Sequence, residues 1–187
     1  EYEKAVELDS TDIDLRFALG RALAYDERYE DAIAQYRWVA EQNPDFPGAQ
    51  LALGDIFYRA GKAKPAYYAE ARPFLEKYTT LMPNDRKGWS LLGRDYYALR
   101  MRDEAGVAMQ KTVDLGDKSK ELYTNMFRLM VERREWQKAL DMAALAEPST
   151  SDMVKLAQVY AFMGNTTAAD STYRAIIARD SLSSDGK

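Results

Sequence analysis

Apolar residues recur along the chain three and four residues apart, which is the pattern of an amphipathic helix with one buried face. The segment WSLLGRDYY shows this spacing clearly, with Trp89, Leu92 and Tyr96 on one side of a predicted helix. Related dipeptides, each followed three residues later by an apolar side chain, occur at Leu19-Gly20, Leu53-Gly54, Leu92-Gly93, Met126-Phe127 and Leu156-Ala157. Each of them marks the middle of a predicted helix.

A series of alanines follows these dipeptides. Its members are Ala32, Ala71, Ala105, Ala139 and Ala169. The steps between them are 39, 34, 34 and 30 residues, so the underlying period is 34 residues. A period of about 20 to 50 residues is typical of repeat architectures, in which a unit cannot bury its apolar face alone. Each unit is therefore predicted to be two antiparallel helices joined by a short turn.

The spacing W-x2-L-G-x2-Y, then A-x3-F-x2-A, then Pro, resembles the tetratricopeptide repeat. The third unit matches best, at Trp89, Leu92, Gly93, Tyr96 and Ala105. It departs from the family pattern at Met109, Thr112 and Asp117, where the family has Phe, Ala and Pro. The resemblance implies an all-α fold, a right-handed α-solenoid of antiparallel helix pairs that forms a superhelix.

The register predicts five repeats between two partial segments. These are the second helix of a truncated repeat in 1–12, repeats in 13–46, 47–85, 86–119, 120–149 and 150–181, and a tail in 182–187. We expect a five-residue insertion near 62–70 to lengthen the turn inside repeat 2, with Pro65 starting the next helix and Pro73 in its early turns. Repeat 4 lacks four residues near 147–150, which would shorten its second helix or the following turn.

Three glycines, Gly20, Gly54 and Gly93, occupy equivalent positions inside predicted helices. Glycine costs about 1 kcal/mol relative to alanine within a helix. We therefore expect another backbone to approach each glycine, with the alanines of the periodic series opposite. The predicted last helix would leave Ile176 and Ile177 uncovered, and because solenoids need polar end caps we expect the chain to be part of a longer protein.

Composition excludes most catalytic chemistry. The chain has no His and no Cys, which removes the commonest general base, metal ligands and thiol nucleophile. Its 26 basic and 30 acidic residues give a net charge of -4, which argues against nucleic-acid binding. It has no run of apolar residues long enough to span a membrane. We expect no enzymatic activity, no metal and no cofactor, and the residues favour no particular compartment.

The family resemblance implies that the first helices of the pairs line a concave groove, which binds a peptide or partner segment. The candidate groove residues are Arg21, Tyr25, Asp55, Tyr58, Arg59, Arg94, Tyr97, Asn125, Arg128, Lys155 and Gln158. Arginines among them could hold carboxylates through paired hydrogen bonds, which would suit an acidic partner. In the alternative interpretation they are solvated charges, some paired with acidic neighbours of their own.

The favoured function is a non-catalytic scaffold for protein–protein interaction. One alternative is a docking or regulatory arm of a larger enzyme or of an envelope-assembly protein, and a less favoured one is an RNA-binding helical repeat. A receptor for acidic chaperone tails is disfavoured, because the Lys, Asn, Asn, Lys and Arg clamp of such family members is matched only in part. The expected partner is another protein or peptide.

Overall fold

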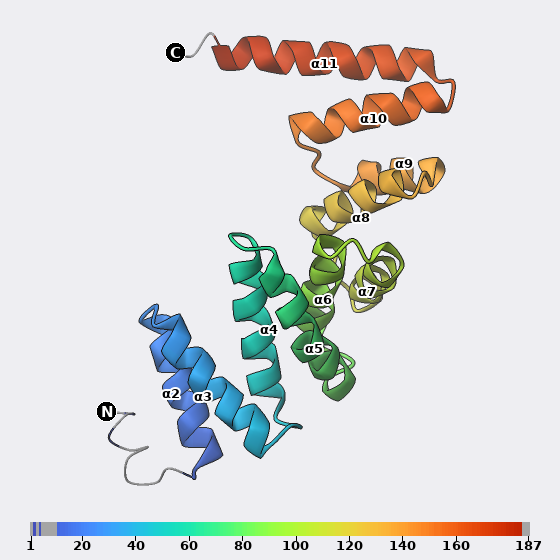
Figure 1. Ribbon diagram of the computed structural model, residues 1–187. Helices are drawn as coiled ribbons and strands as arrows, with labels where there is room; N and C mark the ends of the chain where they lie inside the picture. The colour runs from blue at the N-terminus through green and yellow to red at the C-terminus, as the bar shows by residue number, and fades with distance from the viewer. Residues whose placement is uncertain (1, 3, 5–10, 185–187) are drawn as a thin grey trace. The chain divides into compact units, whose positions relative to one another are not determined.

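The computed structural model describes residues 2, 4 and 11–184, and the side chains through residue 179. In this part of the chain the elements from residue 13 onward are all α-helices, and there is no strand (Figure 1). The helices are α2 (Ile13–Tyr25), α3 (Tyr29–Gln42), α4 (Pro47–Gly61), α5 (Ala66–Leu81), α6 (Arg86–Ala98), α7 (Arg102–Asp114), α8 (Lys120–Glu132), α9 (Trp136–Leu145), α10 (Thr150–Phe162) and α11 (Thr166–Ser184).

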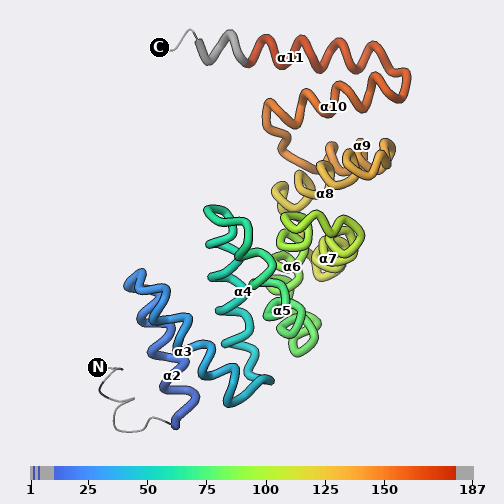
Figure 2. The backbone as a smooth tube through the Cα atoms, in the orientation of Figure 1, coloured from blue at the N-terminus to red at the C-terminus, as the bar shows by residue number. Residues whose placement is uncertain are grey.

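The chain divides into two compact units, Glu1–Leu115 and Gly116–Lys187. In the first unit α2 packs against α3, α4 against α5, and α6 against α7, and successive pairs meet through α3 with α4 and α5 with α6. In the second unit α8 packs against α9 and α10 against α11. The second helix of a pair runs back alongside the first, as Figure 2 shows for α10 and α11. The prediction of an all-α helical-repeat solenoid is confirmed.

Polar residues fix where most first helices begin. The Asp85 carboxylate accepts hydrogen bonds from the backbone N–H groups of Lys87 and Gly88, and so caps α6. At α10, Ser149 and Asp152 form a reciprocal capping box. The side chains of Asp12 and Ser119 accept hydrogen bonds from the backbone N–H groups of Leu15 and Leu122, and so cap α2 and α8. The starts of these helices are therefore encoded locally.

The three-residue turns inside the helix pairs share one backbone conformation. Their middle residues are Glu27, Arg100, Arg134 and Gly164, with φ between 59° and 76°. This left-handed region is unfavourable for residues with a Cβ, and only one of the four turns has glycine there. The sharp reversal between paired helices therefore includes mild backbone strain in three turns.

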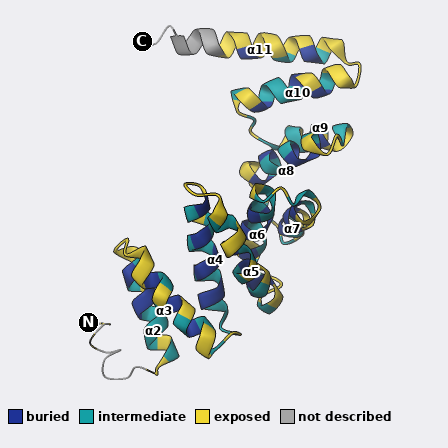
Figure 3. Cartoon of the chain, viewed as in Figure 1, coloured by how far each residue is buried: buried dark blue, intermediate teal, exposed yellow. Residues whose placement is uncertain are grey.

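The core lies between paired helices (Figure 3). The alanine series is buried as the periodicity predicts, with Ala32, Ala71, Ala105 and Ala139 fully inaccessible. A Cβ on Gly93 would lie 3.3 Å from the backbone nitrogen of Met109, so the expected close approach of another backbone is found there.

The residues opposite the glycines differ from those expected. The nearest atoms to a Cβ on Gly54 belong to Leu75, and those to a Cβ on Gly20 belong to Tyr36. Like Met109, these residues lie four positions after a periodic alanine, because the side chain one turn further along the second helix reaches across to the glycine. Because glycine has only a hydrogen atom in place of a side chain, the large side chain of the facing helix fits against it.

The extra residues of repeat 2 lie mostly in its helices. Compared with the first pair, α4 is two residues longer than α2, the turn 62–65 is one longer, and α5 is two longer than α3. The expectation of a much lengthened turn is therefore wrong. Pro65 directly precedes α5, but Pro73 is the eighth residue of that helix and lies beyond its early turns.

The shortened fourth repeat loses its residues from a helix. Helix α9 has 10 residues, whereas α7 has 13 and α3 has 14. Helix α11 continues to Ser184, into the segment expected to be a tail, and the remaining tail residues lie outside the described part. The expected truncated helix in 1–12 also lies almost wholly outside the described residues.

Candidate functional site

Three charged residues of the expected groove occupy equivalent positions on the first helices of the first unit. Arg21 on α2 is exposed, whereas Asp55 on α4 and Arg94 on α6 are half-buried. The Arg94 guanidinium donates a hydrogen bond of 3.1 Å to the hydroxyl oxygen of Ser90, one turn earlier on the same helix. We call these equivalent positions on three successive helix pairs the ladder.

Three aromatic residues of the predicted set lie on the same three helices as the ladder. Tyr25, at the end of α2, is 89% exposed, whereas Tyr58 and Tyr97 are half-buried. The Tyr58 ring packs against Tyr68 of α5, with 5.5 Å between centroids. Arg59, the exposed neighbour of Tyr58, lines a cavity between α3, α4 and α5. None of the other predicted groove residues lines this cavity.

Arg128 in the second unit has a different role from the one expected. Its guanidinium donates two hydrogen bonds to the Asp152 carboxylate, Nε to Oδ1 at 2.8 Å and Nη2 to Oδ2 at 2.7 Å. Asp152 is fully buried, and hydrogen bonds from Arg128 and Ser149 hold its pKa well below its usual range. Lys155 adds an ion pair at 3.7 Å. Arg128 links α8 to α10, so the expectation that it binds a partner's carboxylate is replaced by the internal-pairing alternative.

The two remaining members of the predicted set lie on the same helices. Asn125 on α8 is half-buried and Gln158 on α10 is exposed. They remain predicted groove positions.

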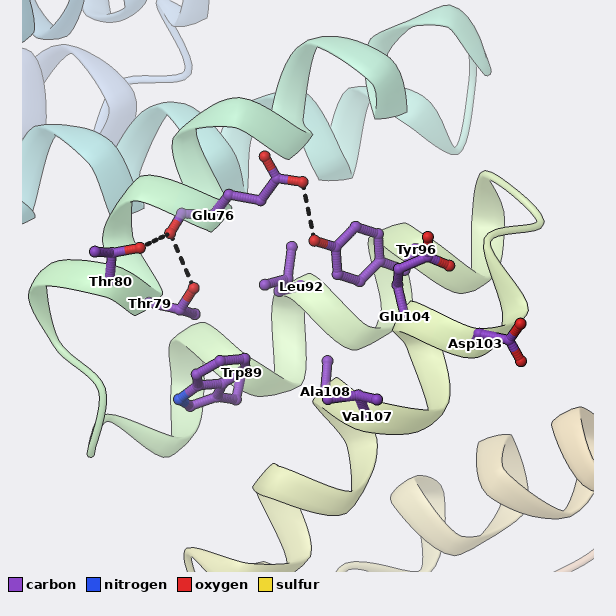
Figure 4. A pocket seen from close by; sticks show the side chains of 10 residues that line it. All are labelled: Glu76, Thr79, Thr80, Trp89, Leu92, Tyr96, Asp103, Glu104, Val107 and Ala108. Carbon is purple, nitrogen blue, oxygen red and sulfur yellow. Dashed lines mark hydrogen bonds between the residues drawn. The ribbon is translucent and has the colours of Figure 1, made fainter.

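A cavity of about 490 Å³ opens between α5, α6 and α7, and we call it the α5–α7 pocket (Figure 4). Its lining residues are Glu76, Thr79, Thr80, Trp89, Leu92, Tyr96, Asp103, Glu104, Val107 and Ala108. Two of its three walls are second helices, whereas the expected groove is on first helices. The pocket was not anticipated from the sequence.

Hydrogen bonds orient the aromatic walls of the α5–α7 pocket. The Tyr96 hydroxyl donates to Glu76 Oε1 at 2.9 Å, and the Trp89 indole N–H donates to the Pro83 carbonyl oxygen at 2.9 Å. Burial, the bond to Glu76 and the negative charges of Glu76 and Glu104 all raise the pKa of Tyr96. The hydroxyl therefore stays protonated, in a negative local potential.

A second cavity, of about 500 Å³, lies between α3, α4 and α5. It is lined by Tyr29, Glu30, Ile33, Ile56, Phe57, Arg59, Ala60 and Tyr67. The Phe57 and Tyr67 rings stack with 6.0 Å between centroids. This cavity is mainly aromatic and aliphatic, and its two charged residues have opposite signs.

One buried carboxyl group lacks a hydrogen-bond partner. Asp95 on α6 is fully inaccessible, and both of its carboxylate oxygens are unpaired. Burial raises its pKa to about 7, with Arg72 opposing the shift and Glu76 adding to it. Asp95 is not among the residues that line either cavity, so its effect is on stability.

Sequence reasoning missed the α5–α7 pocket because its residues come from two repeats. Trp89 and Tyr96 fit the apolar pattern of a core, and Asp103 with Glu104 fits the acidic first turn of a helix. Only the packing of α5 beside α6 brings Glu76 to them. One signal in the sequence could have indicated the pocket. Trp89 and Tyr96 have polar atoms that need hydrogen-bond partners, so both residues are expected to stay partly exposed.

The described residues contain neither a membrane-spanning helix nor a cluster of metal ligands. None of their helices is both long and apolar enough to cross a membrane. No group of three or more carboxylate, imidazole or thiol side chains in the described ranges is placed to hold a metal ion.

Residues 17–86 match the model of the tetratricopeptide repeat family. No curated protein matches the sequence. Solved structures share the fold, among them YrrB, described as a TPR protein with an unusual peptide-binding site, at TM-score 0.80 and 19% identity over 95% of this chain and 91% of that one.

Two other solved structures are similar. The MamA protein has TM-score 0.78 and 16% identity over 92% of this chain and 94% of that one. PilF of Pseudomonas aeruginosa has TM-score 0.68 and 18% identity over 91% and 78%. The match to the tetratricopeptide repeat family therefore covers residues 17–86, and the recurring helix pairs share the fold of these solved structures.

Proposed function

We propose that the chain is a non-catalytic scaffold that binds a peptide or an extended partner segment along its first helices. Tetratricopeptide repeats generally mediate interactions between proteins. The observation that carries the proposal is the ladder of Arg21, Asp55 and Arg94, which places charged side chains outside the core at equivalent positions in three successive helix pairs.

Both the amino-acid composition and the fold support this function. Without His or Cys the chain lacks the usual acid–base and nucleophilic groups. YrrB, which shares the fold, is described as having a peptide-binding site. In this chain the binding residues would be the ladder with Tyr25 and Tyr97. Arginine and tyrosine suit this task, because they combine hydrogen-bond donors with broad contact surfaces.

Peptide selection with the purified chain tests the proposal. A displayed library of random peptides would be selected against the chain, and the affinity of recovered peptides measured by calorimetry. We expect the double variant Arg21→Ala and Arg94→Ala to weaken binding about tenfold or more, as the loss of roughly 1.4 kcal/mol does. The matched control is Lys62→Ala with Arg86→Ala, two exposed cations outside the predicted groove.

The comparison between the two double variants decides the outcome. Unchanged affinity in the Arg21 and Arg94 variant would reject the ladder as the binding site. Equal weakening in both variants would show that only the total charge matters, and would also reject it. Circular dichroism of each variant confirms that the helices are retained.

A further inference from the structure

We propose that the α5–α7 pocket is a second docking site, which takes a Lys or Arg side chain from a basic, partly apolar segment of a partner protein. Two of the pocket's three walls are second helices, and none of its lining residues belongs to the predicted groove, so this proposal is separate from the groove on the first helices. It rests on the cavity's volume of about 490 Å³, its charge and its aromatic walls.

The charge of the lining is entirely negative. Glu76, Asp103 and Glu104 contribute carboxylates, and no Lys or Arg is among the described residues that line the pocket. Arg72 approaches Glu76 at 3.8 Å but does not line the cavity. The chain's net charge of -4 also lies wholly in residues 1–115, which have 16 basic and 20 acidic residues, whereas residues 116–187 have ten of each. A cation is the complementary ligand.

Helix stability accounts for only part of this acidity. Asp103 and Glu104 stand in the first turn of α7, where the helix dipole favours negative charge. Glu76 lies past the middle of α5, where the helix dipole does not stabilise a carboxylate. Its carboxylate is instead held toward the pocket by the Tyr96 hydroxyl (Figure 4).

The remaining lining suits the stem of a long cationic side chain. Figure 4 shows the carboxylates of Glu76 and Glu104 beside Tyr96, with Trp89 at the other end of the pocket. A cation over an aromatic ring is attracted by the ring's quadrupole, and the methylene groups of Lys or Arg pack on apolar surface. Val107, 69% exposed on α7, offers such a surface at this site for an apolar neighbour in the same segment.

The test measures binding of a short, amidated peptide of Lys, Leu and Ala, with a counterpart in which Glu replaces each Lys. We expect the Lys peptide to bind and to shift the NMR signal of the Trp89 indole N–H, assigned with Trp89→Phe. The triple variant Glu76→Gln, Asp103→Asn and Glu104→Gln should weaken binding about tenfold or more. The Glu peptide should not bind.

A charge-matched control separates this site from the acidic surface as a whole. Asp14→Asn, Asp26→Asn and Glu41→Gln remove three exposed carboxylates from the region of α2 and α3, and should leave affinity within about twofold. Equal weakening by the two triple variants, or a Trp89 signal that does not move on binding, would overturn the proposal. Absence of binding by the unmodified chain would overturn it as well.

A second variant does not depend on removing carboxylates. Val107→Lys places a cation of the chain's own beside the three acids, at a position exposed enough to accept it. We expect Val107→Lys to compete with the Lys peptide and to reduce its affinity about tenfold, whereas Val107→Gln, which removes only the apolar contact, should reduce it less. Equal effects of the two substitutions would contradict an electrostatic site. Arg21→Ala with Arg94→Ala should leave this binding unchanged, which separates it from the proposed groove.

Discussion

Arg128 and Asp152 are joined by two parallel hydrogen bonds, 2.8 and 2.7 Å long, which connect α8 to α10 across 24 residues of sequence. Asp152 is fully buried, whereas the Arg128 side chain is about one-third exposed. The Asp152 carboxylate also accepts hydrogen bonds from Ser149, the residue that caps α10. This contact fixes how the first helices of repeats 4 and 5 meet.

Arg128→Ala should lower the free energy of unfolding by about 3 kcal/mol, because it leaves a buried carboxylate without its main partner. Lys155→Ala should cost less than about 1 kcal/mol, since its nitrogen lies 3.7 Å from Asp152 and the side chain is partly exposed. Urea unfolding followed by circular dichroism measures both. Similar losses for the two variants would show that the paired hydrogen bonds matter no more than the weaker ion pair.

Asp95 should make stability fall as pH rises. Its folded-state pKa is raised to about 7, above the unfolded value of about 3.9, so the folded state binds the proton more tightly. The penalty is absent below about pH 4, grows toward pH 7 and is constant above it. Arg72 and Glu76 on α5 act on this carboxyl group with opposite signs.

The isosteric variant Asp95→Asn removes the ionisation. We expect it to stabilise the chain by roughly 1 to 4 kcal/mol at pH 8 and to change stability little at pH 4, because each pKa unit corresponds to about 1.4 kcal/mol. Thermal unfolding at both pH values provides the measurement. A stabilisation independent of pH would show that packing, and not the charge, is responsible.

Gly54→Ala should destabilise the first unit despite alanine's higher helix propensity. The added Cβ would lie 2.5 Å from a methyl carbon of Leu75, which is fully buried and cannot move into solvent. We expect a net loss of about 1 to 3 kcal/mol in the free energy of unfolding. In the double variant with Leu75→Ala the clash is absent, so the combined loss should be smaller than the sum of the single losses. Strict additivity would show that the two positions do not compete for space.

Arg100→Gly should stabilise the turn between α6 and α7. Arg100 has φ of 61°, a region in which a side chain costs roughly 1 to 2 kcal/mol. The gain is reduced by the greater freedom of glycine in the unfolded chain, so we expect about 0.5 to 1 kcal/mol. The control is Gly164→Ala in the equivalent turn, where φ is 76°, and this variant should lose stability. A loss of stability in Arg100→Gly would show that the arginine side chain contributes more than the strain costs.

The fold was predictable because its determinants are short-range and repeated. Leu92 and Gly93 stand three and four residues after Trp89, and Ala105 follows within the same repeat, so one unit contains the pattern of two packed helices. Repetition of that pattern at 34 residues then implies stacking of neighbours. The extra residues of repeat 2 could be recognised from the altered period. Their distribution between α4, the turn and α5 could not be predicted, because the positions of helix ends depend on packing.

The sites could be placed only in part. The sequence by itself determined that Arg21, Asp55 and Arg94 share one helical position, because helical periodicity assigns faces residue by residue. It could not determine which side chains from different repeats would meet. Tertiary packing alone decided that Asp152 would pair with Arg128 inside the protein. It alone also brought Glu76 together with Tyr96 and Glu104 in one pocket. Hydrogen bonds and cavities form between atoms a few ångströms apart, and residues distant in sequence reach that separation only when the helices pack.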